Sequence, residues 1–367
     1  MCFLPMERAM FSSYNPEDVE ILLKDITGLV RPLSTRERER RIQSGTPYSE
    51  MLPIEYVPTE AYMNLYQYGL EQFSDLTARA VESLSAKICE RKQGHPVLVS
   101  LARAGTSIGV LIRSCIRLIY GTDVPHYTIS IIRGQGIDRN AMREILRRHP
   151  AGDIQFVDGW TGKGAISREL SAAMRDFPGV DPGLAVLSDP AGAASLRGTW
   201  EDFLIPSSCL NSVVSGLLSR TFYRKDLIGE GEYHGAAFYR ELREQDLTYA
   251  FIDRILAEIA THLSNGQKLG VQEAAPVFAP GDTGLSELDQ IQRDFAVRDR
   301  NLIKPGIGET TRVLLRRLPW KVLISSREDE RYLGHLYQLA KEKGVETEVY
   351  PLRHYRACGI IRNLADT

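Results

Sequence analysis

The chain has 367 residues, of which 43% are hydrophobic and 25% charged, a balance typical of a globular protein with room for two domains. Its net charge of −2 hides an asymmetry, because residues 300–367 carry 13 Lys and Arg against 8 Asp and Glu, and the rest carries −7. Five scattered cysteines, the lack of a signal-peptide core and the lack of a long apolar stretch argue against a disulfide framework, secretion and a membrane protein. We therefore expect a cytoplasmic protein.

The first 50 residues are expected to form a helical extension. Residues 15–26 begin with a capping residue and carry apolar residues at helical spacing. Ser34 and Glu37 have the spacing of a capping box ahead of a run rich in arginine and glutamate. The arginines of this run either form a solvated surface or reach an anionic ligand, and the sequence leaves both possibilities open.

Strands and helices alternate through residues 51–264, which we expect to form the main domain. The expected strands are 95–102, 126–132, 153–160 and 183–189, and the expected helices are 59–91, 106–121, 140–149, 164–177 and roughly 237–264. This alternation predicts an α/β fold with a parallel sheet and helices on both faces. Its ligand site should lie at the carboxyl ends of the strands.

A second, smaller α/β module is expected at the C-terminus. Residues 265–288 are rich in Gly, Pro and Ala and form the best linker candidate. Residues 289–367 then show strand patterns at 320–326 and 345–352, with helix patterns at 309–317 and 330–344. The chain is therefore expected to contain two α/β domains joined by a linker.

Two strand ends of the main domain carry loops suited to an anion. Arg103–Thr106 follows a buried strand and turns into a helix, whose N-terminus favours negative charge. Asp158 ends a second strand, and Gly159–Gly164 then offer a hydroxyl, flexible backbone amides and a lysine. The spacing fits neither the Walker P-loop nor the GxGxxG dinucleotide fingerprint.

The pair of loops resembles a known family. LARAG and FVDGWTGKG look like the pyrophosphate loop and the 5-phosphoribose loop of type I phosphoribosyltransferases. More closely, residues 10–260 resemble a divergent bacterial branch from tellurium-resistance (Ter) stress operons, a family also described as the cysteine protease StiP family. The stretches that carry this likeness are SLARAGT, SIIRGQGID, FVDGWTGKG, LSDPAG and DFLIPSSCLNSVVSGLLSRT.

The resemblance implies a split site for phosphoribosyl pyrophosphate (PRPP) and Mg²⁺. The pyrophosphate would be bound by Arg103, Ala104, Gly105 and Thr106. Asp158 would hold the ribose hydroxyls as a catalytic group, and the 5-phosphate would lie against Gly159, Trp160, Thr161, Gly162, Lys163 and Gly164. The implied reaction is phosphoribosyl transfer to a base or base-like acceptor, which would make a nucleoside-like metabolite or modify RNA.

The loop departs from the usual pattern at two positions. Gly159 replaces a second acidic residue, and Trp160 is bulkier than the residue usually found there. Asp189, at the end of the next strand, is the candidate for the missing carboxylate and for a metal ligand. The alternative for Asp189 is an Asp-Pro turn.

Residues 131–143 stand where related enzymes often carry a mobile catalytic loop. Arg133, as a catalytic group, and Arg139 would close over the pyrophosphate, and Gly134 and Gly136 make a hinge plausible. The alternative is a surface turn with solvated arginines.

The segment 200–225 is expected to form a pocket wall. Under the transferase interpretation Ser207, Ser208, Cys209, Asn211 and Ser215 line the acceptor pocket. Under a protease interpretation Cys209 is the nucleophile and needs a histidine within hydrogen-bond reach, with His126, His234 and His262 as candidates. A third possibility is that Cys209 is a small buried core residue.

The C-terminal module resembles the Pelota-like, kink-turn-binding ribosomal protein superfamily over about 70 residues. In that superfamily a Gly-x-Asn-Glu-x-x-Lys loop and helix start clamp the RNA bend. The matching stretch 306–312 has Gly308 in place of the Asn and Arg312 in place of the Lys. The RNA-binding residues implied are Lys304, Gly306, Gly308, Glu309, Thr310, Arg312 and Arg316. A basic module used for protein docking is the alternative.

Three functions are therefore open at this point. The first is Mg²⁺- and PRPP-dependent transfer to a base, the second is non-catalytic sensing of PRPP or a nucleotide by an RNA binder, and the third is proteolysis through Cys209.

Overall fold

A computed structural model describes residues 11–271, 276 and 282–362 of the chain. Its main body is a six-stranded sheet in which every neighbouring pair is parallel, in the order β1-β4-β3-β7-β8-β9. The strands are β1 (Glu20–Ile21), β3 (Val97–Leu101), β4 (His126–Ile129), β7 (Ile154–Trp160), β8 (Leu184–Ser188) and β9 (Leu196–Thr199). The prediction of a parallel α/β sheet is confirmed.

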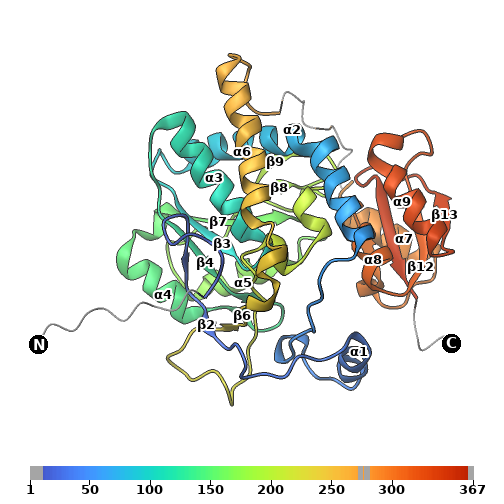
Figure 1. The fold of residues 1–367 in the computed structure, drawn as a ribbon, viewed down its shortest axis with the longest axis horizontal. Coiled ribbons are helices and arrows are strands. Elements are labelled where there is room, and N and C mark those ends of the chain that lie inside the picture. The colour runs from blue at the N-terminus through green and yellow to red at the C-terminus, as the bar shows by residue number, and fades with distance from the viewer. Residues whose placement is uncertain (1–10, 272–275, 277–281, 363–367) are drawn as a thin grey trace, which may run out of the picture.

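Helices cover both faces of this sheet (Figure 1). One face packs against α2 (Glu60–Arg91), α3 (Ala104–Tyr120) and α6 (Thr248–Ser264), and the other against α4 (Arg139–Arg148) and α5 (Ala165–Ala173). Alternating strand residues divide between the two cores, so that Val157 joins the first and Phe156 the second. The expected helix 59–91 and the expected helices after each strand are present.

The N-terminal segment differs from the prediction. Residues 15–26 are not a helix but contain β1 and β2 (Lys24–Asp25), and β1 adds an edge strand beside β4. Burial of Val19, Leu22 and Ile26 against the main domain takes precedence over the local helical spacing. Farther along, α1 (Thr35–Gln43) begins as expected, because the Ser34 hydroxyl accepts a hydrogen bond from the Glu37 backbone N–H at 3.3 Å.

Other elements refine the predicted boundaries. The strand expected at 126–132 splits into β4 and β5 (Ile131–Ile132), and β5 forms a hairpin with β6 (Gly136–Ile137). The helix expected from 237 begins only at Thr248, after β10 (Gly235–Ala236), which pairs with β2. Short 3-10 helices fill much of the rest: η1 (Tyr48–Glu50), η2 (Ala151–Asp153), η3 (Met174–Asp176), η4 (Pro206–Cys209), η5 (Ser212–Val214), η6 (Arg240–Gln245) and η7 (Arg300–Leu302).

The C-terminal domain is a four-stranded mixed sheet between helices. Its strand order is β11-β14-β12-β13, with β12 and β13 parallel and the other pairs antiparallel. The sheet separates α7 from α8 and α9. The bounds are α7 (Gly284–Asp294), β11 (Ile303–Pro305), α8 (Ile307–Arg316), β12 (Pro319–Ile324), α9 (Glu330–Glu342), β13 (Glu346–Val349) and β14 (Ala357–Ile361).

The two domains share an apolar interface beside α2 (Figure 1). Phe73 of α2 is fully buried, and its ring centroid lies 5.3 Å from that of Tyr332 in α9. The Tyr68 hydroxyl donates to the Arg331 carbonyl at 2.8 Å, and the Tyr62 hydroxyl donates to the Leu315 carbonyl at 3.0 Å. The C-terminal domain is therefore docked along α2, and α7 already begins at Gly284, inside the stretch predicted as a linker.

None of the helices in the described residues has the length and apolar character needed to span a membrane.

Candidate functional site

The two predicted anion loops lie side by side at the carboxyl edge of the main sheet. They follow β3 and β7, which are neighbours, and the chain order reverses here because β4 lies on one side of β3 and β7 on the other. A Cβ on Gly105 would lie 2.7 Å from the Val157 carbonyl oxygen and 3.1 Å from the Asp158 Cα, so only glycine allows this approach. The loops therefore meet at a topological switch point, where open α/β sheets bind ligands.

Two helices begin at this meeting point. Neither α3 nor α5 has a side-chain cap hydrogen bond among the described residues. Gly164 precedes α5 with a φ of +63°, a conformation that glycine adopts without strain. Uncapped N-terminal N–H groups, together with the helix dipoles, favour an anion between the loops.

The first loop, residues 103–106, is only partly free for a ligand. The Arg103 guanidinium donates to the Leu218 carbonyl at 2.9 Å, so it points toward segment 212–218. The Thr106 hydroxyl is fully buried and hydrogen-bonds to the Thr128 hydroxyl at 2.7 Å, which turns it away from the predicted pyrophosphate. Gly105 is buried and Ala104 exposed, so a ligand here would meet chiefly the backbone and the arginine.

Asp158 stands at the centre of the site. It is half-buried, and within the described residues its carboxylate accepts a hydrogen bond only from the Gly159 N–H, at 2.8 Å. Burial raises the pKa of Asp158 to about 7, although the Gly159 N–H and Arg312 act in the opposite direction. A carboxylate so poorly satisfied by the protein has capacity to accept hydrogen bonds from ribose hydroxyls.

The second loop, residues 161–164, lies directly against the C-terminal domain. The Tyr355 hydroxyl donates to the Gly162 carbonyl at 2.6 Å, and the Lys163 ammonium donates to the Arg300 carbonyl at 2.8 Å. A Cβ on Gly162 would lie 3.2 Å from the Pro305 carbonyl oxygen. The loop predicted to hold the 5-phosphate is therefore a contact surface between the domains as well.

Helix α8 faces the first domain rather than solvent. The buried carboxylate of Asp202 accepts from the Ile307 N–H at 2.8 Å and from the Arg356 N–H at 2.8 Å. At the other end of the helix the Arg316 guanidinium donates to the Cys209 carbonyl at 2.8 Å and to the Asn211 side chain. The residues expected to clamp RNA through Gly306–Arg316 thus lie within the domain interface.

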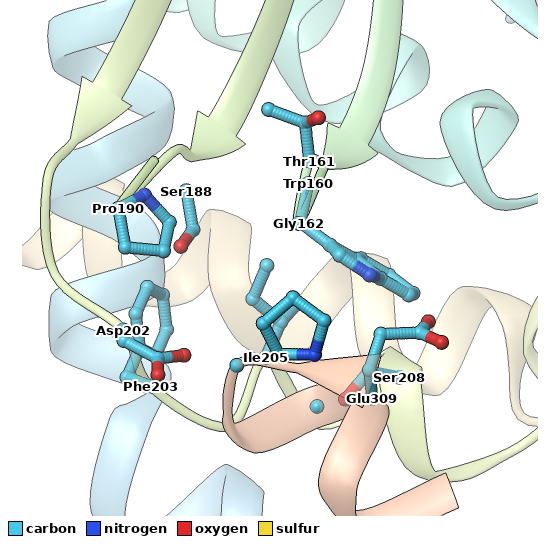
Figure 2. A pocket seen from close by; sticks show the side chains of 13 residues that line it. Trp160, Thr161, Gly162, Ser188, Pro190, Asp202, Phe203, Ile205, Ser208 and Glu309 are labelled. Carbon is cyan, nitrogen blue, oxygen red and sulfur yellow. The ribbon is translucent and has the colours of Figure 1, made fainter. Parts of the chain in front are cut away.

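A pocket opens between the two domains at this point. Figure 2 shows Trp160, Thr161 and Gly162 at the end of β7 on one side and Glu309 on the other. Its full lining comprises Trp160, Thr161, Gly162, Ser188, Pro190, Asp202, Phe203, Ile205, Ser208, Pro305, Gly306, Gly308 and Glu309. Residues from both predicted sites, the phosphate loop and the RNA clamp, therefore form one composite site.

Cations crowd around this composite site. Burial and Lys304 lower the pKa of Lys163 to about 8, and burial and Arg312 lower the pKa of Arg316 to about 10. Arg312 itself lies over the Trp160 ring, 5.8 Å from its centroid, and pairs with Glu309 at 3.3 Å. An anionic ligand bound here would reduce the electrostatic repulsion among these cations.

A second group of arginines flanks the first loop. Burial, Arg38 and Arg103 together lower the pKa of Arg220 to about 10. The Arg220 guanidinium lies 5.4 Å from the centroid of the Tyr48 ring, and its Nη1 donates to the Tyr48 carbonyl at 3.3 Å. Arg38 comes from the arginine-rich helix α1, so one arginine of that helix does reach the basic region.

Two predicted residues have other partners. Asp189 is fully buried, and its carboxylate accepts from the Ala193 and Ala194 N–H groups and pairs with Arg197, so it stabilises its own loop instead of supplying a metal ligand or a second ribose carboxylate. The exposed Arg139 pairs with Asp176 of η3.

Arg133 is exposed at the tip of the β5–β6 hairpin, where Gly134 and Gly136 both have a positive φ. Its backbone N–H donates to the Tyr48 hydroxyl at 3.1 Å, and its charge contributes to lowering the pKa of Lys163. The hairpin therefore borders the basic region, and its catalytic role stays a prediction.

The predicted acceptor residues form the first-domain side of the interface. Ser208 is buried in the pocket, and its hydroxyl has no hydrogen-bond partner among the described residues. Asn211 is held by Arg316, and the Ser215 hydroxyl donates to the Asn211 carbonyl at 2.8 Å. Ser207 is half-buried in η4 beside them.

Cys209 has the surroundings of a core residue. It is fully buried, its sulfur lies 4.0 Å from the Leu65 carbonyl, and burial raises its pKa to about 12. No histidine in the described residues hydrogen-bonds to it. Of the candidate partners, His126 bonds to Ser100, His234 to Ser130 and His262 to Asp75 and Glu82.

Magnesium would depend on the substrate for most of its ligands. The described part of the chain contains no group of three His, Cys, Asp or Glu residues placed to hold a metal. Asp158 has an oxygen to offer, and Mg²⁺ commonly combines one or two carboxylates with phosphate oxygens and water. The residues present thus fit a substrate-borne ion better than a resident one.

Several residues of the composite site were not singled out from the sequence. Tyr355 and Lys163's partner Arg300 come from segments without a recognisable motif, and Asp202 was not singled out within the predicted pocket wall. The importance of all three follows only from domain docking. The stretch WEDF around Asp202 begins the predicted pocket wall, but an acid at that position gives no sequence signal of a domain contact.

Comparison with known proteins places the chain in a family. Residues 12–256 match the family model described as "Tellurite-like stress resistance cysteine protease StiP", and residues 282–363 match that of the PELOTA RNA binding domain. The protein named "Cysteine protease StiP" from Acinetobacter baylyi is 36% identical over 375 residues, covering 98% of this chain and 96% of that protein. The chain therefore belongs to the StiP family and carries a C-terminal domain of the PELOTA RNA-binding type.

Proposed function

We propose that the chain binds a phosphorylated ribose, PRPP or a close analogue, at the edge of the main sheet and transfers the phosphoribosyl group to a nitrogen acceptor. The observation that carries the proposal is the meeting of two uncapped helix N-termini and two glycine-containing loops around the half-buried Asp158. The crowded lysine and arginine side chains add the charge that a pyrophosphate and a 5-phosphate require.

The proposed reaction breaks the bond between ribose C1 and the pyrophosphate oxygen. The electron pair leaves with pyrophosphate, the acceptor nitrogen forms a bond to C1, and the acceptor's proton passes to solvent. Asp158 would orient the ribose through its hydroxyls, while Arg103 would stabilise the charge that develops on the leaving group. Mg²⁺, when bound with the substrate, would supply further neutralisation of the pyrophosphate.

The direct test is Mg²⁺-dependent release of pyrophosphate from PRPP. The full chain would be incubated with PRPP and a panel of purines, pyrimidines and short RNAs, and released pyrophosphate would be measured with a coupled pyrophosphatase assay. Acceptor-dependent release supports transfer. Saturable PRPP binding without release for any acceptor would favour the sensing function instead.

The pH dependence of PRPP binding should have two limbs. Asp158, with a pKa of about 7, gains its charge as pH rises, whereas Lys163, with a pKa of about 8, loses its charge. Affinity should therefore rise from pH 6 toward a maximum at about pH 7–8 and fall above it. Titration calorimetry on the wild type and Asp158→Asn checks this, because the variant should lose the change due to Asp158; an unchanged acidic limb would contradict the assignment.

Peptide hydrolysis is the second candidate, because the matched family and the Acinetobacter relative both carry the name cysteine protease. A thiol nucleophile needs a lowered pKa and a neighbouring base, whereas the surroundings of Cys209 raise its pKa. Partial burial raises the pKa of Cys89 as well, and full burial raises that of Cys115.

Replacing Cys209 by Ala should leave phosphoribosyl transfer within about twofold of the wild type, because its thiol is fully buried in the core and lies 4.0 Å from the Leu65 carbonyl. Cys115→Ala, at another fully buried thiol, is the matched control. Both variants would be assayed for pyrophosphate release and for cleavage of an unstructured protein. Peptide cleavage that is lost in Cys209→Ala but kept in Cys115→Ala would establish the protease function.

The match to an RNA-binding domain supports an RNA partner, but the matching clamp is not exposed. Ile307 is bonded to Asp202, and Arg316 is bonded to Cys209 and Asn211. These contacts bind the clamp residues to the first domain. They therefore favour a role in the composite phosphate site over a role as a free RNA clamp.

A further inference from the structure

The side of the C-terminal domain that faces the phosphate loop carries cations with few protein partners. Lys304 of β11 is half-buried in this region, and its ammonium group forms no hydrogen bond with any described residue. Arg312 has only Glu309 and the face of Trp160 as partners across the described chain. Buried or half-buried cations are normally paired, so these two positions lack a counter-ion of adequate charge.

Both cations lie opposite the predicted 5-phosphate loop. Lys304 lies near Lys163, whose charge it disfavours, and the Pro305 carbonyl oxygen lies 3.2 Å from a Cβ position on Gly162. The indole of Trp160 lies beneath Arg312, and Figure 2 shows Trp160 and Glu309 directed toward one another across the pocket. Thr161 and Gly162 therefore line the pocket, and the cations Lys163, Lys304 and Arg312 flank it at the domain interface.

The single carboxylate of Glu309 does not neutralise the three cations Lys163, Lys304 and Arg312. Burial pushes the pKa of Glu309 up, but Arg312, Lys304 and the Trp160 indole together hold it below its ordinary value, so it is ionised near neutral pH. Even so, one carboxylate faces Lys163, Lys304 and Arg312. Asp158, which also lies near Arg312, is only partly ionised near neutral pH because burial raises its pKa to about 7. A net positive charge therefore remains, which suits a phosphate monoester dianion.

We propose that Lys304 and Arg312 form the second half of the 5-phosphate site, so that a phosphate monoester is held between the two domains. The proposal rests on the proposed function and adds a role for the C-terminal domain: its clamp residues bind the sugar phosphate of the substrate instead of a phosphate of RNA. The docked domain thereby completes the site and excludes water from the loop at Thr161–Lys163.

Ribose 5-phosphate is the probe that tests this assignment, with inorganic pyrophosphate as the second ligand. Lys304→Met and Arg312→Gln remove the charges while keeping most of each side-chain volume. Arg327→Gln is the matched control, because Arg327 is exposed on the same domain. Binding of each ligand to the full chain would be measured by titration calorimetry, and thermal unfolding would verify that each variant is folded.

We expect both Lys304→Met and Arg312→Gln to weaken ribose 5-phosphate binding about tenfold or more, and to weaken pyrophosphate binding less than threefold. Arg327→Gln should bind both ligands as the wild type does. If the wild type binds ribose 5-phosphate and the two variants bind it equally well, the composite site is wrong while the proposed function stands. If the wild type binds neither ribose 5-phosphate nor PRPP, the proposed function itself fails.

Competition with RNA tests whether Lys304 and Arg312 bind RNA instead of the sugar phosphate. A short kink-turn RNA should not displace ribose 5-phosphate from the full chain, because the clamp is docked. RNA binding that is lost in Lys304→Met and Arg312→Gln, with ribose 5-phosphate binding unchanged, would return these residues to an RNA clamp and overturn the proposal.

Discussion

Asp158→Asn should weaken PRPP binding by about 10- to 100-fold, measured by titration calorimetry in the presence of Mg²⁺. Hydrogen bonds to a charged group contribute about 1.5–3 kcal/mol, and each 1.4 kcal/mol changes affinity tenfold. Asp158 has the capacity for such bonds, since its only hydrogen bond within the described residues comes from the Gly159 N–H. The substitution preserves shape, so the loss would report charge and acceptor capacity rather than packing.

The matched control for this variant is Asp153→Asn. Asp153 lies immediately before β7, whereas Asp158 lies near its carboxyl end, so the two variants alter the same strand at opposite edges of the sheet. The control should bind PRPP as the wild type does. Equal affinities for wild type, Asp158→Asn and Asp153→Asn would remove Asp158 from the site.

Asp202→Ala should loosen the docking of the C-terminal domain by about 2–3 kcal/mol. The Asp202 carboxylate joins the Ile307 N–H at the start of α8 to the Arg356 N–H, and its loss leaves two buried donors without their partner. The cost is reduced because burial raises the pKa of Asp202 to about 6, so its ionised form is already disfavoured. Hydrogen exchange should accelerate in peptides that cover 305–316 and 355–358, and the unfolding midpoint should fall by about 3–4 °C.

Two further variants serve as a graded substitution and a control for Asp202→Ala. Asp202→Asn retains one acceptor oxygen and should show a smaller effect. Glu328→Ala removes an exposed acid of the C-terminal domain and should leave exchange unchanged. Wild-type exchange rates in Asp202→Ala would show that this carboxylate does not hold the domains together.

The sequence predicted the main sheet and the adjacency of the two loops well, for a simple reason. Parallel strands end at one edge, so motifs after β3 and β7 must meet if those strands are neighbours. Periodicity likewise placed α2 and α3, because their buried faces are long. The two-residue strand β1 was missed because so short an element leaves no alternation to detect.

The composite character of the site was beyond the sequence pattern. The residues of α8 read as an exposed basic clamp, and spacing alone does not say whether a helix faces RNA or another domain. The role of Asp189 was ambiguous in the same way, because an Asp-Pro pair at a strand end suits both a metal ligand and a turn. Only the hydrogen bonds from the Ala193 and Ala194 N–H groups identify the turn. For Cys209 the sequence left a nucleophile, an acceptor-pocket residue and a buried core residue as alternatives, and only the packing shows that it is fully buried.

The central claim is that this member of the StiP family binds PRPP at the edge of its main sheet. Its most direct test is titration of PRPP with Mg²⁺ into the full chain at about pH 7.5. We predict saturable binding at one site, with a dissociation constant of about 1 µM–1 mM, that is weakened at least tenfold in Asp158→Asn. No saturable binding to the wild type, or equal binding to the variant, would contradict the account.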